Sequence, residues 1–164
     1  MGRVFFNTKE NVQEMTSAVS TYQVLDSDSG KTFLLNSASA MTLTLPADAD
    51  IEIGWNCKFL MILDNDNAYT INCSDTTDTT GQMFIGGVNV QHIADATANV
   101  FQGYAATAAD DNQIVLDTNL DHNQAKAGSF VNVIKVATNR FMVSGHVASA
   151  DADGTGAAIF GDVD

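Results

Sequence analysis

The sequence predicts an all-β protein, an antiparallel β-sandwich or flattened barrel, and three observations support this class. Short runs of β-branched and aromatic residues alternate with polar residues, and clusters of Gly, Asn, Asp and Ser separate them. Only 16% of the residues are charged, whereas helical bundles are rich in Lys, Glu and Arg. The strand patterns do not alternate with long helical ones, so we expect about eight to ten short strands in one domain.

Length and charge restrict the class of partner. A chain of 164 residues can bury a substantial core as one domain. Seven basic and twenty acidic residues give a net charge of −13, which repels phosphate backbones and anionic membranes, so we expect no nucleic acid partner. MGRVFF lacks the apolar run of a secretory signal, and no segment approaches the roughly 18 apolar residues of a membrane span. We therefore expect a soluble compartment and no membrane.

Residues 1–20 form a predicted N-terminal arm, because they show no β alternation. Phe5 and Phe6 are adjacent and need burial, either against this chain or against a neighbour. A short helix in the arm would place three apolar residues on one face, namely Val12, Met15 and Val19.

The predicted β-domain spans residues 21–147, and the segment 26–46 is its most complete unit. This segment reads DSDSGKTFLLNSASAMTLTLP, which predicts a turn, a strand, a small-residue turn and a second strand. Pro46 has no backbone N–H to donate, so it ends the second strand.

A hairpin is predicted around the turn formers DNDN at 64–67, with strands at 56–63 and 68–74. Period-two geometry places Cys57, Phe59, Met61 and Leu63 on one face, and Tyr69, Ile71 and Cys73 on one face of the second strand. Cys57 and Cys73 are then a candidate cross-strand thiol pair, although a register shifted by two residues would pair Phe59 with Cys73. We expect two buried free thiols.

The second half of the chain contains further strand patterns. The run 83–90 is a strand in which Gly86 and Gly87 indicate a bulge or bend. We expect extended chain around 99–104 and a short strand at 113–117. The segments 129–136 and 140–147 predict a second hairpin, in which Phe141, Val143 and Val147 share one face. Residues 148–164 form a predicted mobile acidic C-terminal tail, with Ile159 and Phe160 as a docking point.

The polar residues show no recognisable catalytic or metal-binding pattern. His92, His122 and His146 lie in unrelated contexts without a nucleophile motif. The clusters 64–67 and 151–154 offer oxygen ligands for calcium, but neither has the full binding loop, and turn formation and solubility explain them. We therefore expect no enzyme activity, no catalytic residue, no metal and no cofactor.

The order of the motifs resembles that of capsid decoration (cement) proteins and related head-fibre domains of tailed bacteriophages. The motifs are a turn DSGK, strands TFLLN, TLTLP and KFLMIL, then YTIN and IGG, and a closing hairpin FVNVIKV and RFMVSG. They cover approximately residues 21–145, and Phe141 stands where the family often has Trp in the last strand.

This resemblance implies a structural protein, commonly a homotrimer, that is assembled in the host cytoplasm and resides in the virion on the capsid exterior. It would bind the major capsid protein and stabilise the head by bridging capsid subunits. We expect Val4, Phe5 and Phe6 to anchor it. The alternative is a carbohydrate- or receptor-binding fibre module in which Trp55, Tyr22, Tyr69 or Tyr104 stacks on a sugar.

Overall fold

Two β-sheets make up the part of the chain that this computed structural model describes, which comprises residues 11–64, 67–77, 80–93, 101–106, 111–117, 125–150 and 159–161. The predicted all-β class is confirmed, because the regular elements are strands and two short 3-10 turns. Among the described residues there is no helix long and apolar enough to cross a bilayer.

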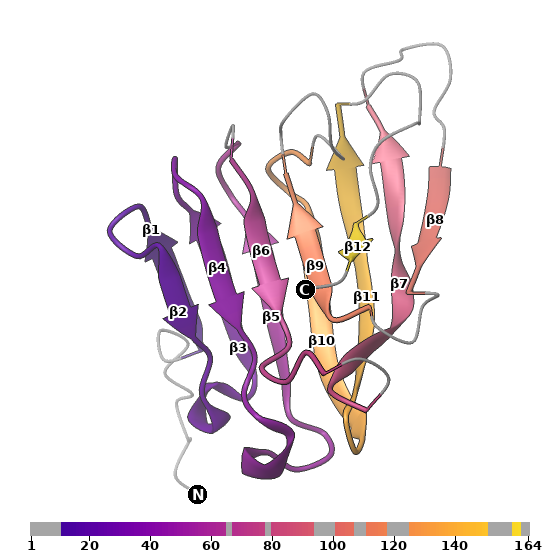
Figure 1. Ribbon diagram of the computed structural model, residues 1–164. Coiled ribbons are helices and arrows are strands. Elements are labelled where there is room, and N and C mark those ends of the chain that lie inside the picture. Colours follow the sequence, from indigo (N-terminus) through magenta and orange to yellow (C-terminus); the bar gives the residue numbers. More distant parts are fainter. Residues whose placement is uncertain are drawn as a thin grey trace, which may run out of the picture.

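The larger sheet, sheet A, contains seven strands (Figure 1). In spatial order they are β1 (Val12–Thr16), β3 (Lys31–Asn36), β5 (Asn56–Met61), β10 (Phe130–Ala137), β11 (Arg140–Ser149), β7 (Met83–His92) and β8 (Phe101–Ala105).

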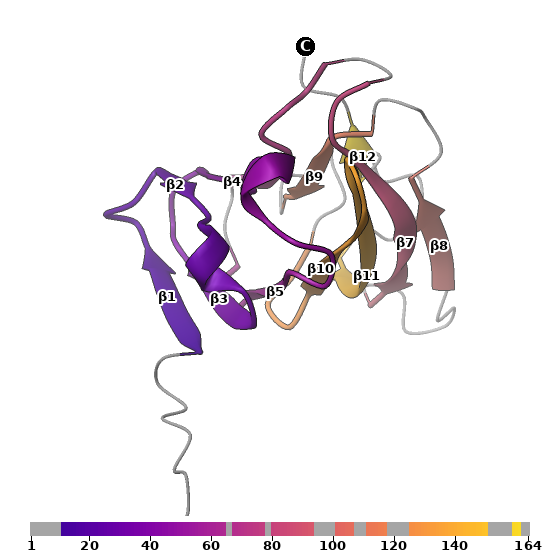
Figure 2. The same ribbon diagram turned by 90° about the horizontal axis from the view of Figure 1, so that it is seen from below.

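The smaller sheet, sheet B, contains five strands that form a second layer over sheet A, as Figure 2 shows. In spatial order they are β12 (Phe160–Gly161), β9 (Gln113–Leu116), β6 (Tyr69–Asn72), β4 (Met41–Thr44) and β2 (Thr21–Gln23). The 3-10 turns are η1 (Asp26–Asp28), which precedes β3, and η2 (Asp48–Asp50), which precedes β5.

From β1 to β6 the chain alternates between the two sheets, so that each odd strand lies in sheet A and each even strand in sheet B. Neighbouring strands in this part are parallel: β1 pairs with β3, β3 with β5, β2 with β4, and β4 with β6. We call each successive pair, β1–β2, β3–β4 and β5–β6, a rung. The prediction of antiparallel pairing throughout is therefore wrong, since five of the ten strand pairings are parallel.

Similar side chains occupy equivalent positions in successive rungs. Phe33 pairs with Phe59, and their rings stack with centroids 5.4 Å apart. In sheet B, Thr21, Thr42 and Thr70 are in register on the outward side, while Leu43 and Ile71 are in register on the buried side. Parallel stacking of rungs thus joins like residues into ladders.

The rest of the chain adds antiparallel pairs to both sheets. Strands β10 and β11 form the predicted hairpin, whose turn contains Asn139 at φ 54°. Phe141, Val143 and Val147 face the core as predicted. Strand β7 pairs in parallel with β11 in continuous register, so a bulge predicted at Gly86 does not form, although Gly86 has φ 94°. A Cβ at Gly86 would lie 2.5 Å from the carbonyl oxygen of Val143, so the close approach of β7 to β11 requires glycine.

One apolar core lies between the layers and draws residues from both sheets. Its largest fully buried side chains include Tyr69, Phe33, Phe59, Phe84 and Phe141. The Trp55 ring meets that of Phe141 edge-on at 6.3 Å, which connects the rungs to the hairpin. Both parts of the chain therefore share one core.

The segments near the two ends of the described chain agree only in part with the predictions. The helix predicted in the arm is wrong, because Val12–Thr16 is strand β1 of sheet A and buries only Met15. The sheet also extends beyond residue 147, to Ser149 in β11. Ile159 and Phe160 are buried, and Phe160 pairs with Ile114, so the docking point predicted in the tail exists. Residues 1–10, 151–158 and 162–164 lie outside the described part.

Candidate functional site

The outer side of sheet A carries two rows of apolar side chains that cross several strands. In the first row Leu34 pairs with Leu60 and Leu60 with Phe130; in the second, Ile134 pairs with Met142 and Met142 with Ile85. Met142 is 43% exposed and Ile85 37%, although each lies in a regular strand. We call these six residues, together with Lys58 and Arg140, face A.

Cations accompany these apolar rows. Lys58 lies between them in register with Asn132, and its Nζ is 4.3 Å from the centre of the Phe130 ring. Arg140 begins β11 next to the inward-facing Phe141, and its Nη1 donates to the Asn139 carbonyl at 2.8 Å. Neither cation has an ion-pair partner among the described carboxylates. Strands β3, β5, β7, β10 and β11 contain no Asp or Glu in a chain with twenty of them, and the outward carboxylate of the neighbouring strand β1, Glu14, pairs with Leu34 at the sheet edge. Face A is therefore apolar and cationic on an acidic protein.

The outer side of sheet B has a different character. The ladder of Thr21, Thr42 and Thr70 continues to Val115, and a second ladder contains Thr44, Asn72 and Gln113. The Gln113 amide donates to the Asn72 side-chain oxygen at 3.2 Å. This surface consists largely of hydroxyl and amide groups that water solvates well, so it has little to gain from a protein partner.

A second apolar surface surrounds the two 3-10 turns, where the chain crosses between the sheets. Leu25 is 51% exposed and Ile53 68%, and exposed Asp26, Asp50 and Glu52 accompany them. We call these five residues the acidic corner. The indole N–H of Trp55 donates to the Asp26 carbonyl at 3.2 Å and so holds η1 against the segment that follows η2.

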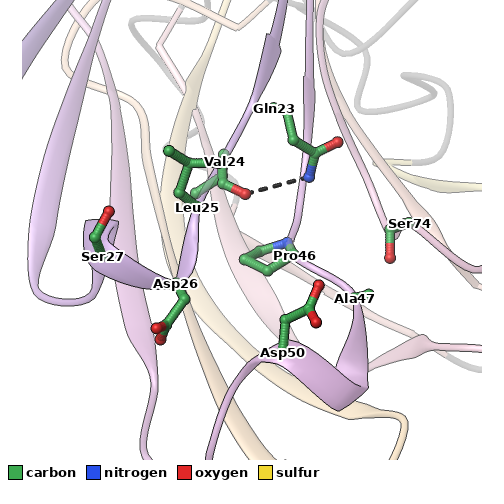
Figure 3. A pocket seen from close by; sticks show the side chains of 9 residues that line it. All are labelled: Gln23, Val24, Leu25, Asp26, Ser27, Pro46, Ala47, Asp50 and Ser74. Atoms are coloured by element: carbon green, nitrogen blue, oxygen red, sulfur yellow. Dashed lines mark hydrogen bonds between the residues drawn. The ribbon is translucent and has the colours of Figure 1, made fainter.

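An open hollow of about 630 Å³ lies beside the acidic corner, at the ends of β2, β4 and β6 (Figure 3). Leu25, Asp26, Pro46 and Asp50 are among the residues that line it. The amide of Gln23 also lines it, but it donates to the carbonyls of Val24, Thr44 and Leu45. The hollow thus presents carboxylates on a partly apolar surface.

A buried ion pair fixes η2 relative to the β10–β11 hairpin. Lys135 is 5% exposed, and its Nζ donates to the Asp48 carboxylate at 2.8 Å and to the Asp48 and Ile51 carbonyls at 2.6 and 2.8 Å. The Asn139 N–H donates to the same carboxylate at 2.8 Å. Desolvation acts to raise the pKa of Asp48, but the hydrogen bonds from Lys135 and Asn139 and the lysine charge outweigh it and lower the pKa.

A second ion pair supports η1. The buried Asp28 carboxylate accepts from the Lys31 ammonium at 2.6 Å, from the Leu25 N–H at 2.9 Å and from the Tyr22 hydroxyl at 3.2 Å. The hydrogen bond to Asp28 is the main cause of the raised pKa of Lys31. These contacts give the acidic corner a fixed backbone, so its exposed side chains occupy defined positions.

The predicted pairing of Cys57 with Cys73 is wrong, because the predicted hairpin at 56–74 does not form. Cys57 lies in β5 of sheet A, opposite Lys31 and Val133, whereas Cys73 follows β6 of sheet B. Both are free and buried. Desolvation raises the pKa of both thiols, with smaller contributions from Asp28 at Cys57 and from Asp75 at Cys73. Thiols that resist ionisation are poor nucleophiles and metal ligands.

The aromatic residues considered for sugar stacking do not form an exposed platform. Trp55 is 4% exposed and Tyr69 is fully buried, with its hydroxyl donating to the Ser37 carbonyl at 2.6 Å. Tyr22 is half-buried against Phe33, with ring centroids 5.7 Å apart. The side chain of Tyr104 lies outside the described part. Trp55, Tyr69 and Tyr22 therefore stabilise the core and its edge.

The structure describes only some of the remaining predicted site residues. Val4, Phe5, Phe6, His122 and the cluster 151–154 lie outside the described residues. His92 is buried, whereas His146 lies on the outer side of sheet A beside Phe130. The Asp64 carboxylate of the first acidic cluster accepts from the Ala127 N–H at 2.6 Å. Among the described residues there is no group of three His, Cys, Asp or Glu side chains that could hold a metal.

Sequence reasoning missed face A and the acidic corner. One signal was available, since five strand segments contain no acidic residue and four of them carry a Lys or Arg, although the chain has twenty acidic residues. It could not be used before β10 and β11 were placed beside β5 and β7. No family model, curated protein or solved structure matches this chain.

Proposed function

We propose that this chain is a non-enzymatic structural protein of a virion, a capsid decoration (cement) protein that binds the outer surface of a phage head. The observation that supports the proposal is that each motif of the resemblance falls on a strand or on the turn before it. DSGK lies at η1 and the start of β3, TFLLN in β3, TLTLP at β4, KFLMIL at β5, YTIN in β6 and IGG in β7. FVNVIKV and RFMVSG lie in the β10–β11 hairpin.

Such a protein would stabilise the head by linkage. If it bridges neighbouring copies of the major capsid protein, separating them also requires losing the bridge, so binding favours the intact shell. A homotrimer has three equivalent contacts and suits three-fold positions on a capsid. A net charge of −13 also favours a protein partner over nucleic acid or an anionic membrane.

The proposed anchor is the aromatic segment at Val4, Phe5 and Phe6. Strand β1 begins at Val12 and pairs with β3 at the edge of sheet A. The Asn11 carbonyl accepts from the Thr32 N–H at 2.8 Å, so the chain is attached to the sheet from residue 11, within the predicted arm of residues 1–20. An anchor in the arm would therefore act on a rigid body.

The test is binding of the purified full chain to expanded phage heads that lack it, followed by cryo-electron microscopy. We expect density at regular positions on the head lattice and a higher disassembly temperature of the heads. Deleting Met1–Thr8, or changing Phe5→Ala and Phe6→Ala, should weaken binding at least about tenfold. Asn7→Ala with Thr8→Ala is the matched control and should bind as the wild type does. Density at the tail, or no binding, would refute the function; full binding by the deletion variant would refute the anchor alone.

A further inference from the structure

We propose that face A of one copy of this chain binds the acidic corner of a second copy. The contact specifies the self-association in the proposed homotrimer and rests on that part of the proposed function. It requires no capsid, so it can be tested with the purified chain and can fail separately from head binding.

Both surfaces have the composition of a protein interface. Face A presents Met142 beside Ile85 in one row and Phe130 beside Leu60 in the other, all in regular strands. The acidic corner presents Leu25 and Ile53, which have the largest exposed fractions of the bulky apolar side chains described. Exposed apolar groups of this size gain free energy when a partner removes them from water, and Met and aromatic residues are enriched in interfaces.

The charges determine which surface meets which. Face A has Lys58 and Arg140, and the carboxylate in register with it, Glu14, lies beside Leu34 at the β1 edge, so two such faces would bring mainly cations together. The acidic corner has Asp26, Asp50 and Glu52 and no cation, so two corners would repel as well. The combination of face A with the corner pairs the two cations with three carboxylates, and repulsion between like charges disfavours both symmetric alternatives.

The positions of the two surfaces determine the kind of assembly. Face A covers the outer side of sheet A, whereas the acidic corner lies where η1 and η2 lead into β3 and β5, at one end of the strands. The two surfaces therefore point in different directions on one copy. An interface between two different surfaces is heterologous, and it closes into a ring when the rotation between copies permits. A trimer is the ring that the proposed function requires.

The experiment is sedimentation velocity on the full chain over a range of concentrations. We expect the wild type to assemble into a closed oligomer that weakens as salt rises from about 0.05 to about 0.5 M, because salt screens the charge pairs. Lys58→Glu with Arg140→Glu, and separately Asp50→Lys with Glu52→Lys, should each raise the dissociation constant at least about tenfold. Combining all four substitutions in one chain should restore assembly, since the charges are then exchanged.

Lys126→Glu is the matched control, because it reverses a half-exposed cation that lies 3.8 Å from Asp64 and belongs to neither surface. It should assemble as the wild type does. A monomeric wild type at all concentrations, unchanged assembly of both double variants, or a fourfold variant that stays monomeric while retaining its thermal unfolding transition would each overturn the proposal. Met142→Ser, which changes no charge, should also weaken assembly, and it covers the case in which a charge variant fails to fold.

Discussion

The rungs and the β10–β11 hairpin bury the same kind of core with different pairing rules. In the hairpin, a strand pairs with its sequence neighbour across the turn at 138–139. In the rungs, a strand pairs with a strand one rung away: Val12 with Thr32, and Lys31 with Cys57. The hairpin partner is therefore the next strand across a local turn, whereas the rung partner is a strand one rung away, and similar residues are in register at only some positions, such as Phe33 with Phe59.

The two parts meet at Lys135 and Trp55. Lys135 belongs to β10 and binds the η2 turn of the rungs, and Trp55 belongs to the rungs and contacts Phe141 of the hairpin. Different pairing rules need not produce separate folding units when the core is shared. The following predictions test how far the two parts depend on each other.

The largest effect is expected from truncating one core ring in each part. Phe59→Ala removes a ring from the stacked pair in the rungs, and Phe141→Ala removes the ring between Trp55 and Phe84. Each should lower the free energy of unfolding by about 3–5 kcal/mol. Urea denaturation followed by both fluorescence and circular dichroism should still give one transition. Two separated transitions in either variant would show that the parts unfold independently.

The second effect concerns the ion pair that joins the parts. Lys135→Met keeps most of the length of the side chain but removes the ammonium donor from the Asp48 carboxylate and from two carbonyls, so we expect a loss of about 3 kcal/mol. Lys126→Met is the control, because its pair with Asp64 is half-exposed and should contribute less than about 1 kcal/mol. Equal losses in the two variants, measured by urea denaturation, would contradict a special role for the buried pair.

The third effect concerns the turn between β3 and β4. The Tyr69 hydroxyl donates to the Ser37 carbonyl at 2.6 Å and accepts from the Ser37 N–H at 3.0 Å. Tyr69→Phe leaves both buried groups without this partner and should cost about 2 kcal/mol. Tyr22→Phe removes a half-buried hydroxyl 3.2 Å from Asp28 and should cost less than about 1 kcal/mol. If thermal unfolding showed a larger loss of stability for Tyr22→Phe than for Tyr69→Phe, the hydrogen bond at η1 would be the stronger of the two and the prediction would be wrong.

The smallest effect is a dependence on pH. The pKa of Asp48 is lower in the folded protein, so the folded state binds this proton less readily than the unfolded state. The associated stability is present above the unfolded pKa, near pH 4, and is lost as the pH falls through the folded value. Between about pH 6 and about pH 3 the wild type should lose more stability than Asp48→Asn. If urea denaturation showed the same loss of stability for the wild type and for Asp48→Asn, the pH dependence would come from other carboxylates.

Sequence reasoning predicted the strands and their buried faces better than the pairing of the strands. Ile71 and Cys73 alternate with polar residues, and Phe59 and Met61 are two residues apart on either side of Leu60, so period-two geometry identified their faces correctly whichever strand lies beside them. The cluster at 64–67 reads as a turn in either topology, and it connects two sheets rather than two paired strands. A local turn signal specifies a change of direction, not the next partner.

The repeat that could have identified the rungs is short and unevenly spaced. TYQV, TLTL and TINC occupy equivalent positions in β2, β4 and β6, but Thr21 and Thr42 are separated by fewer residues than Thr42 and Thr70. The extra residues of the third rung hide the period. Face A could not be predicted for a related reason, because Lys58 and Met142 come close only when β5, β10 and β11 are adjacent.

The winding of the rungs also bears on synthesis by the ribosome. The three rungs leave the ribosome in the order in which they stack, so the strands that each new rung pairs with have already been translated. The other neighbour of β5 is β10, and Cys57 there pairs with Val133, which is translated much later. The nascent chain can therefore stack its rungs early. The side of β5 that later pairs with β10 stays unpaired until the hairpin has been translated. During that interval β5 is an open sheet edge that a chaperone or another nascent copy could occupy.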